Sequence, residues 1–290
     1  MSDNFCVFND DSIPFDHSEA ERVCRDFLCT VRDMRVRLNI EIIRCKNPEV
    51  RLADLRVIES GSRLFSLREY LKSGSRGELK DLWSRFLSLT TTGYLDEVDW
   101  SEKIPEDCFD FARRTDAPLL GFGSKGQGVK GLRYLSSPEH VIEEWKYRCS
   151  FVDPASFNLF FPKLMWAENN KSIPLKQVDK EFFSRLVEKI FIPLQLMAEK
   201  LVQESLSKKF SINYIKNSTG IQNIATESDS VRNNQELAKF RCFSAEGIGT
   251  VYFPFHIKER DQNGAIRIYL YWSGKHIYFS LTRHLPTKRY

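Results

Sequence analysis

The chain has 290 residues, 42% of them hydrophobic and 28% charged, and a formal net charge of +4. This composition excludes a disordered chain and allows one large domain or two, while the mildly basic balance permits nucleic-acid binding without requiring it. Because no apolar run reaches the length that crosses a bilayer, and the first residues lack the basic start and apolar core of a signal peptide, we expect a cytoplasmic protein with no membrane partner.

Residues 1–210 are predicted to form a mixed α+β domain with a helical core. A short strand is expected at residues 5–8, followed by a helix that opens at Ser18 with a capping box and runs to about Asp33. The apolar spacing then changes to two, which predicts a half-buried strand that ends near Pro48; a helix that continues past Asp33 is the alternative. Further helices are expected at residues 62–72, 78–89, 107–114, 137–149 and 179–208, the last of them kinked near Phe191 by Pro193.

Carboxylates and cysteines are the residues that could hold a metal ion. The loose acidic cluster at residues 96–102 lies in a predicted loop without a lysine-bearing strand, unlike the paired carboxylates of metal-dependent nucleases. The seven cysteines are odd in number and include no C-x-x-C pair, which argues against a disulfide framework and a zinc knuckle. We therefore predict neither a metal site nor a cofactor, and expect most cysteines to be small buried residues.

Five of the fourteen glycines lie between residues 118 and 131, and the segment from Gly121 to Gly126 formally matches G-x-G-x-x-G. A dinucleotide fingerprint needs a strand before this motif and a helix that opens within it. The preceding apolar pair is short and no helix is predicted to start at Gly126. We favour a loop that carries Lys125 and Lys130 over a phosphate cradle, and keep a nucleotide-binding enzyme as a rival function.

The run at residues 157–166, from Phe157 to Trp166, is intensely apolar. Core packing is the default explanation, and a surface for a protein partner is the alternative. Just before it, Glu144-Trp145-Lys146 has the E-x-K form found in restriction-type nucleases. That triplet needs a strand, and here the pattern places it in a helix, so we discount it.

Composition changes at residues 211–238, which are rich in Asn, Ser and Thr. We predict a polar loop or hinge there and place the domain boundary within it. Residues 239–290 then form a small antiparallel β-module. The whole chain is thus expected to be α+β, with a largely helical N-terminal region that contains some strands, followed by a β-meander.

The β-module is predicted from three strands joined by tight turns. Residues 251–258 contain Pro254, which is typical of an edge or bulged strand. Residues 265–272 are the clearest strand, because Ile266, Ile268 and Leu270 alternate with polar side chains, and an Asn-Gly turn precedes them. Residues 276–281 form the third strand, and the apolar face of the meander is expected to lie on the core.

The other face is predicted to carry cations, histidines and tyrosines. Either it is solvated, with cross-strand Arg–Tyr and His–Tyr pairs, or it binds nucleic acid through phosphate contacts and stacked tyrosines. A catalytic version uses these side chains as acid, base and anion stabilisers in metal-independent RNA cleavage. The candidate catalytic residues are His256, Lys258, Arg267, Tyr269 and His284, and the candidate nucleic-acid contacts are Tyr271, His276, Arg283, Lys288 and Arg289.

Residues 252–287 resemble the C-terminal sheet of RelE/ParE-type toxins. The resemblance rests on His256-Ile257-Lys258, the turn after it, Arg267-Ile268-Tyr269 and a last strand that ends in a basic tail. It implies a ribosome-associated RNase surface in which Lys258, Arg267, Tyr269 and His284 are the positions to test. The chain is longer than those toxins and has a polar segment where they have a helical hairpin.

The leading hypothesis is a nucleic-acid-acting protein, an RNase-like toxin or defence effector whose β-module acts on RNA or DNA. The alternative is a non-catalytic interaction subunit of a bacterial defence or nucleic-acid-processing complex. Such a subunit would bind its protein partner through residues 157–166.

Overall fold

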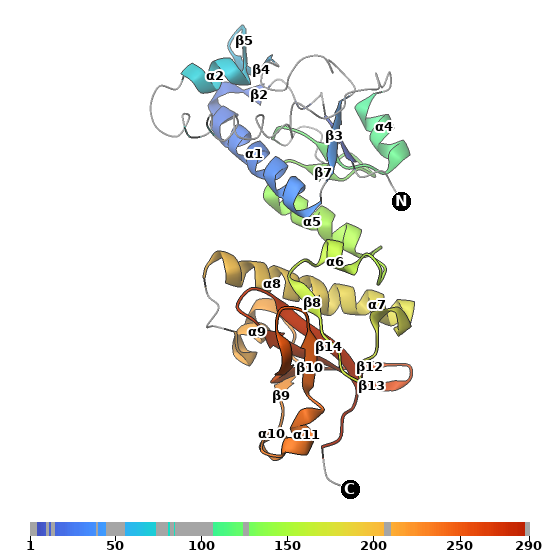
Figure 1. The fold of residues 1–290 in the computed structure, drawn as a ribbon. Coiled ribbons are helices and arrows are strands. Elements are labelled where there is room, and N and C mark those ends of the chain that lie inside the picture. Colours follow the sequence, from blue (N-terminus) through green and yellow to red (C-terminus); the bar gives the residue numbers. More distant parts are fainter. Residues whose placement is uncertain are drawn as a thin grey trace. The chain divides into compact units, whose positions relative to one another are not determined.

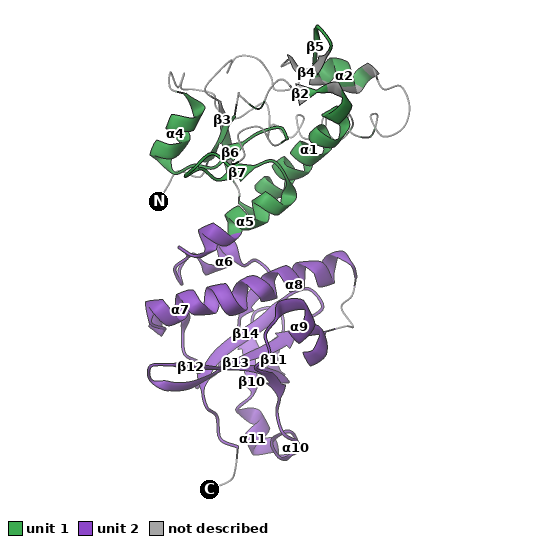
Figure 2. Ribbon diagram, turned by 180° about the vertical axis from the view of Figure 1, so that it is seen from behind, with its two compact units in different colours: residues 1–145 green, residues 146–290 purple. Residues whose placement is uncertain are grey.

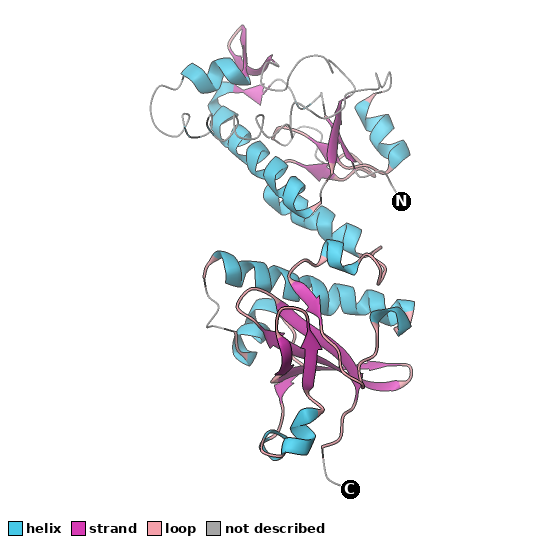
Figure 3. Cartoon of the chain, viewed as in Figure 1, coloured by secondary structure: helices cyan, strands magenta, loops and turns pink. Residues whose placement is uncertain are grey.

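The computed structural model describes residues 5–9, 12, 15–38, 40–44, 56–73, 81, 84, 107–123, 128–205 and 210–287. They form a mixed α+β fold, as predicted (Figures 1 and 3). The chain divides into two compact units, residues 1–145 and residues 146–290, called unit 1 and unit 2 below (Figure 2). The division therefore falls after residue 145 and not within residues 211–238, where the sequence predicted it.

Unit 1 is built on a parallel sheet with strand order β3-β1-β6-β7. Its strands are β1 (Phe5–Phe8), β3 (Glu41–Arg44), β6 (Leu119–Leu120) and β7 (Tyr134–Leu135). All of β1 is buried, as expected for a parallel strand covered on both faces. The ring of Phe27 in α1 (Ala20–Arg37) contacts Phe8, and that of Phe111 in α4 (Cys108–Thr115) contacts Phe5, which points to the opposite side of β1.

The second sheet of unit 1 has the order β2-β4-β5 and is followed by α2 (Leu67–Ser73). Its strands are β2 (Phe15–Asp16), β4 (Arg56–Ser60) and β5 (Arg63–Ser66). The predicted capping box is wrong, because Ser18 lies in a 3-10 turn (His17–Glu19) and donates its backbone N–H and its hydroxyl to Asp16. Helix α1 also runs four residues beyond its predicted end at Asp33.

Two predictions for unit 1 concern mostly residues that the structure does not describe. The helix expected at residues 78–89, apart from Asp81 and Ser84, and the acidic cluster at residues 96–102 lie outside the described residues. So do Lys125 and Gly126 of the glycine-rich segment. At Gly121 a Cβ would lie 2.2 Å from the hydroxyl of Tyr134, so close packing explains this glycine.

Unit 2 is built on a sheet with strand order β8-β14-β13-β12-β9. Its strands are β8 (Leu164–Trp166), β9 (Ile224–Thr226), β12 (Phe255–Asp261), β13 (Gly264–Trp272) and β14 (Ile277–Arg283). The last three form the predicted antiparallel meander, with Gly264 at a φ of 119° in its first turn. Because β8 and β9 pair with this meander, it belongs to a larger sheet and is not a separate module.

One face of this sheet packs on a long helical segment (Figure 1). It consists of α7 (Lys180–Leu186), a π-helical turn (Val187–Phe191) and α8 (Ile192–Gln203). The π turn ends two residues before Pro193, close to the predicted kink, because proline has no N–H to continue the helical bonding pattern. The Phe191 ring lies 4.9 Å from that of Phe157 and 5.1 Å from that of Phe279, at the centre of an aromatic core.

The apolar run at residues 157–166 belongs to this core. Phe157, Phe161 and Leu164 are buried, so the predicted partner surface is not present at these positions. Among the apolar residues of α6 (Phe157–Phe160), Leu159 is strongly exposed, at 81%. Core packing is therefore the correct interpretation for the three buried residues.

The opposite face of the sheet, predicted to be polar and open, is largely covered. Residues 211–238 are not a loop, since they contain α9 (Ile212–Thr219), β9, α10 (Asp229–Arg232) and most of α11 (Gln235–Lys239). After them β10 (Cys242–Ala245) and β11 (Gly249–Tyr252) form a hairpin. Phe243 and Phe253 of this region pack with Tyr269, Tyr278 and Leu285 into a second core.

Candidate active site

The register of the sheet brings four of the five candidate catalytic residues together. His256 on β12 lies opposite Tyr269 on β13, and Lys258 lies opposite Arg267. Residues two apart in a strand share a face, so all four side chains project from the face that the hairpin partly covers.

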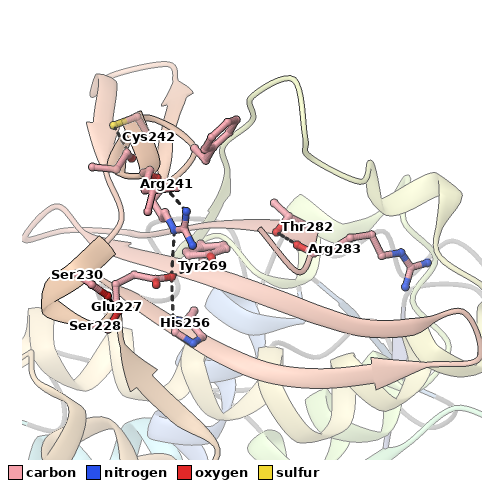
Figure 4. Close-up of polar contacts among 12 residues, drawn as sticks. Glu227, Ser228, Ser230, Arg241, Cys242, His256, Tyr269, Thr282 and Arg283 are labelled. Carbon is pink, nitrogen blue, oxygen red and sulfur yellow. Dashed lines mark hydrogen bonds and ion pairs between the residues drawn. The ribbon is translucent and has the colours of Figure 1, made fainter. Parts of the chain in front are cut away.

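A fifth residue, Glu227, joins this group although the sequence analysis did not single it out. Strand β9 pairs with β12 so that Ala225 lies opposite His256, and Glu227 follows two residues later on the same side. Its Oε1 accepts a hydrogen bond of 3.0 Å from the Tyr269 hydroxyl and lies 3.4 Å from Nδ1 of His256 (Figure 4). Glu227 is 6% exposed, so its carboxylate meets protein rather than water.

The guanidinium that balances this carboxylate belongs to Arg241, which precedes β10 and is 1% exposed. Its Nε lies 3.3 Å from Oε1 of Glu227, and another of its nitrogens donates to the Leu237 carbonyl at 2.9 Å. The Tyr252 hydroxyl, at the end of β11, is buried without a hydrogen bond, and burial and then the charge of Glu227 raise the pKa of this tyrosine. Glu227 is thus the charge around which the buried polar groups gather.

His256 is neutral at physiological pH. Its pKa is lowered from 6.5 to about 4, chiefly by burial; Glu227 raises it, and the charges of Arg267, Lys258 and Arg241 add to the lowering. Nδ1, the ring nitrogen that faces Glu227, is buried and makes no hydrogen bond. Nε2 makes no hydrogen bond to a described group and is not fully buried, so part of its surface meets solvent. The residue as a whole is 6% exposed, and the lone pair of its neutral imidazole is able to accept a proton, although the lowered pKa makes it a weak base at neutral pH.

Lys258 and Arg267 form a pair of like charges directly opposite each other. Such a pair destabilises a sheet unless an anion binds to it. Lys258 is exposed, and its amino group has no acidic partner among the residues that the structure describes. The Arg267 guanidinium donates a hydrogen bond of 3.2 Å to the neighbouring Ile266 carbonyl. Both cations are therefore available to a phosphate beside His256.

The tyrosines do not play the predicted role. Tyr269 is 1% exposed and Tyr278 is also buried, so neither is able to stack on a base. Burial, and then Glu227, raise the pKa of Tyr269, which argues against a proton acceptor at this hydroxyl. The predicted open face is wrong for these residues because the hairpin side chains Phe243 and Phe253 occupy it. Tyr271 is half-buried and stacks on Phe253 at 5.6 Å.

The remaining candidates lie away from this group. Arg283 makes a bidentate ion pair of 2.6 and 2.9 Å with Asp261, which ties the end of β14 to the turn after β12. His284 follows β14, is exposed, and no described contact joins it to His256. Lys288 and Arg289 lie outside the described residues.

His276 belongs to a second basic group at the other end of β14. The first residues of β8 and β14 pair, so Lys163 lies beside His276, and Lys275 precedes it in the turn. Burial lowers the pKa of His276, and the charges of Lys163 and Lys275 lower it further. The sequence pointed to His276 but not to Lys163, which is distant in the chain.

Other chemistry finds less support among the described residues. No three His, Cys, Asp or Glu side chains gather there in a way that could hold a metal ion, and no described helix is long and apolar enough to cross a membrane. Six described cysteines are free, and burial raises the pKa of Cys24 and Cys149 to about 12, so these two thiols are unreactive at neutral pH.

The E-x-K triplet is helical, as predicted, because Glu144 lies in α5 (Pro138–Cys149). Its carboxylate pairs with Arg133.

These features define a two-unit α+β protein with a buried cluster of Glu, His, Arg and Tyr side chains. Beside it lie two cations, Lys258 and Arg267, that have no acidic partner among the described residues. Comparison of the chain with protein-family models, with curated proteins and with solved structures finds no match. Function therefore has to be argued from the site alone.

Proposed function

We propose that unit 2 binds RNA and cleaves it without a metal ion, with His256 as proton acceptor and Lys258 and Arg267 as phosphate ligands. The observation that carries this proposal is the solvent-facing Nε2 of a neutral imidazole beside two cations that lack an acidic partner among the described residues. General bases contribute about 10²- to 10⁴-fold to such reactions. Cations placed at the phosphate stabilise the charge of its transition state.

The cleavage step follows from these roles. Nε2 of His256 takes the proton of a ribose 2′-hydroxyl, whose oxygen forms a bond to the adjacent phosphorus. The bond from phosphorus to the 5′ oxygen breaks, and that oxygen takes a proton from water. The products are a 2′,3′-cyclic phosphate and a 5′-hydroxyl, and His256 returns its proton to solvent. DNA lacks the 2′-hydroxyl and would bind without being cleaved.

The distribution of charge supports unit 2 as the nucleic-acid-binding part. Residues 146–290 contain 22 Lys and Arg against 13 Asp and Glu, a net charge of +9. Residues 1–145 contain 21 Lys and Arg against 26 Asp and Glu, a net charge of −5. The overall value of +4 hides this contrast, and a net positive unit attracts a polyanion at long range.

An RNase of this kind would act as a toxin or as an antiviral defence effector. Both roles need access to cellular or invading RNA, which places the protein in the cytoplasm. The resemblance of the C-terminal strands to RelE/ParE-type toxins points the same way, since Lys258 and Arg267 belong both to the resemblance and to the candidate site.

The test is cleavage of a fluorescent single-stranded RNA by the full-length protein in EDTA at low salt. We expect a 2′,3′-cyclic phosphate product, no cleavage of the 2′-O-methyl RNA, and loss of activity in His256→Ala but not in His140→Ala of unit 1. Loss of activity in His284→Ala alone would assign the base to His284 instead. If the protein neither binds nor cleaves RNA at low salt, where electrostatic attraction is strongest, the proposal fails.

A further inference from the structure

Glu227 lies beside one of the two ring nitrogens of His256. Neutral imidazole has one N–H and one lone pair, and a neighbouring group decides their places. Nδ1 is buried without a hydrogen bond, and Oε1 of Glu227 lies 3.4 Å from it. An ionised carboxylate only accepts hydrogen bonds, so it attracts an N–H at Nδ1 and repels a lone pair there.

The surroundings of Glu227 keep its carboxylate in the accepting role. The Tyr269 hydroxyl donates to Oε1, and the Arg241 guanidinium lies beside the same oxygen. A protonated carboxyl group would lose its attraction to this buried guanidinium. The charged or titratable groups that surround His256 come from four places in the fold: Glu227 after β9, Arg241 before β10, Lys258 on β12, and Arg267 and Tyr269 on β13.

We propose that Glu227 is a positioning residue that holds His256 with its proton on Nδ1, so that the lone pair of Nε2 faces solvent. Without this restraint, the imidazole would also populate the tautomer with Nε2–H, which has no lone pair for a substrate proton. Glu227 thus relates to His256 as the buried acid of a catalytic triad relates to its histidine, where it fixes the tautomer and ring orientation without taking the proton. The consequence for RNA cleavage rests on the proposed function, whereas the tautomer does not.

The direct test is NMR of the full-length protein labelled with ¹⁵N-histidine at pH 7. Two-bond correlations from the ring protons distinguish a protonated nitrogen from one with a lone pair, and His256→Gln assigns the signal. We expect Nδ1 to be protonated and Nε2 to carry the lone pair. The opposite pattern in the unaltered protein would overturn the proposal without need of any variant at Glu227.

A matched pair of variants tests the cause. Glu227→Gln keeps the shape but brings an amide that is able to donate to Nδ1, so the His256 signal should shift toward the Nε2–H tautomer. Tyr269→Phe removes a different donor from the same Oε1 without touching His256, and the tautomer should stay as it is. If Glu227→Gln leaves the tautomer unchanged, another group fixes it and the proposal is wrong. Glu227→Asp, which retains the charge, should recover the Nδ1–H form if it folds.

The same variants separate this inference from the proposed function. With an active protein, Glu227→Gln should reduce the single-turnover cleavage rate about 10²- to 10⁴-fold, with little change in RNA affinity. If the tautomer responds as expected but no form of the protein cleaves RNA, the proposed function fails and the role of Glu227 stands. If RNA is cleaved and the tautomer is Nε2–H, the role of Glu227 fails, whereas RNA cleavage stands with a proton acceptor other than Nε2 of His256.

Discussion

Acidification should destabilise unit 2 through His256. The pKa of this residue is about 4 in the folded protein, against an ordinary value of 6.5. The unfolded chain therefore binds a proton first as the pH falls, and acid favours unfolding. One pKa unit corresponds to about 1.4 kcal/mol, so the free energy of unfolding should fall by about 2 kcal/mol between pH 7 and pH 4.5, after allowance for the solvent contact of Nε2.

Hydrogen exchange of the β13 backbone amides measures this loss, because these central amides open with the unfolding of unit 2. Other groups also titrate in this range, so the same experiment on His256→Gln provides the reference. Protection, corrected for the intrinsic exchange rate, should fall about 30-fold more in the unaltered protein than in the variant, as 2 kcal/mol requires. Equal losses in both proteins would show that His256 has an ordinary pKa. A gain of protection in acid would show that Glu227, and not burial, dominates.

Three further predictions concern packing and charge in unit 2. Phe191→Ala should lower the free energy of unfolding by about 3–5 kcal/mol in urea titrations, whereas exposed Leu159→Ala should change it by less than about 0.5 kcal/mol. Arg241→Ala should lower the free energy of unfolding by about 3–5 kcal/mol, because it leaves a buried carboxylate unpaired. Arg232→Ala, which breaks an exposed ion pair, should lower it by less than about 1 kcal/mol, and thermal unfolding compares the two variants. Lys258→Ala should lower the slope of log K against log salt by about 0.7 in single-stranded RNA titrations.

The meander could be predicted because its signals are local. Ile266, Ile268 and Leu270 alternate with polar residues, and the structure buries all three on β13. The Asn-Gly turn before them is also local, since Gly264 takes the positive φ that the turn requires. The sequence did not predict that His256 lies opposite Tyr269 and Lys258 opposite Arg267, because residues 251–258 alternate imperfectly and only the register of β12 with β13 sets these pairs.

The burial of the other face of the unit 2 sheet, beneath the β10–β11 hairpin, could not be predicted from local signals. A tyrosine suits a solvated sheet face and a buried one equally well, because its ring is apolar and its hydroxyl polar. Only the contacts with Phe243 and Phe253 decide that Tyr269 is buried. Likewise, nothing around Glu227 in the sequence marks it, and its role depends on β9 pairing with β12.

The domain boundary predicted within residues 211–238 is wrong because polar residues are common both in linkers and at helix caps. Residues 211–238 have the composition of a linker, yet several of their polar side chains are helix caps. Ser211 accepts from the Tyr214 amide at the start of α9, and Asn234 accepts from two amides at the start of α11. Gly220 ends α9 with a φ of 75°. Short helices need many caps, so a run of them resembles a loop in composition.

Three arrangements that reduce stability occur together in unit 2. Lys258 faces Arg267 across two strands, His256 is held away from its ordinary pKa, and the Glu227–Arg241 pair is buried where apolar side chains of the same volume are often at least as stabilising. Each arrangement alone has a structural explanation. All three meet at His256, whose pKa responds to each of these charged residues. A fold selected only for stability has no reason to concentrate such costs at one point, so their meeting at His256 marks this cluster as a candidate functional site.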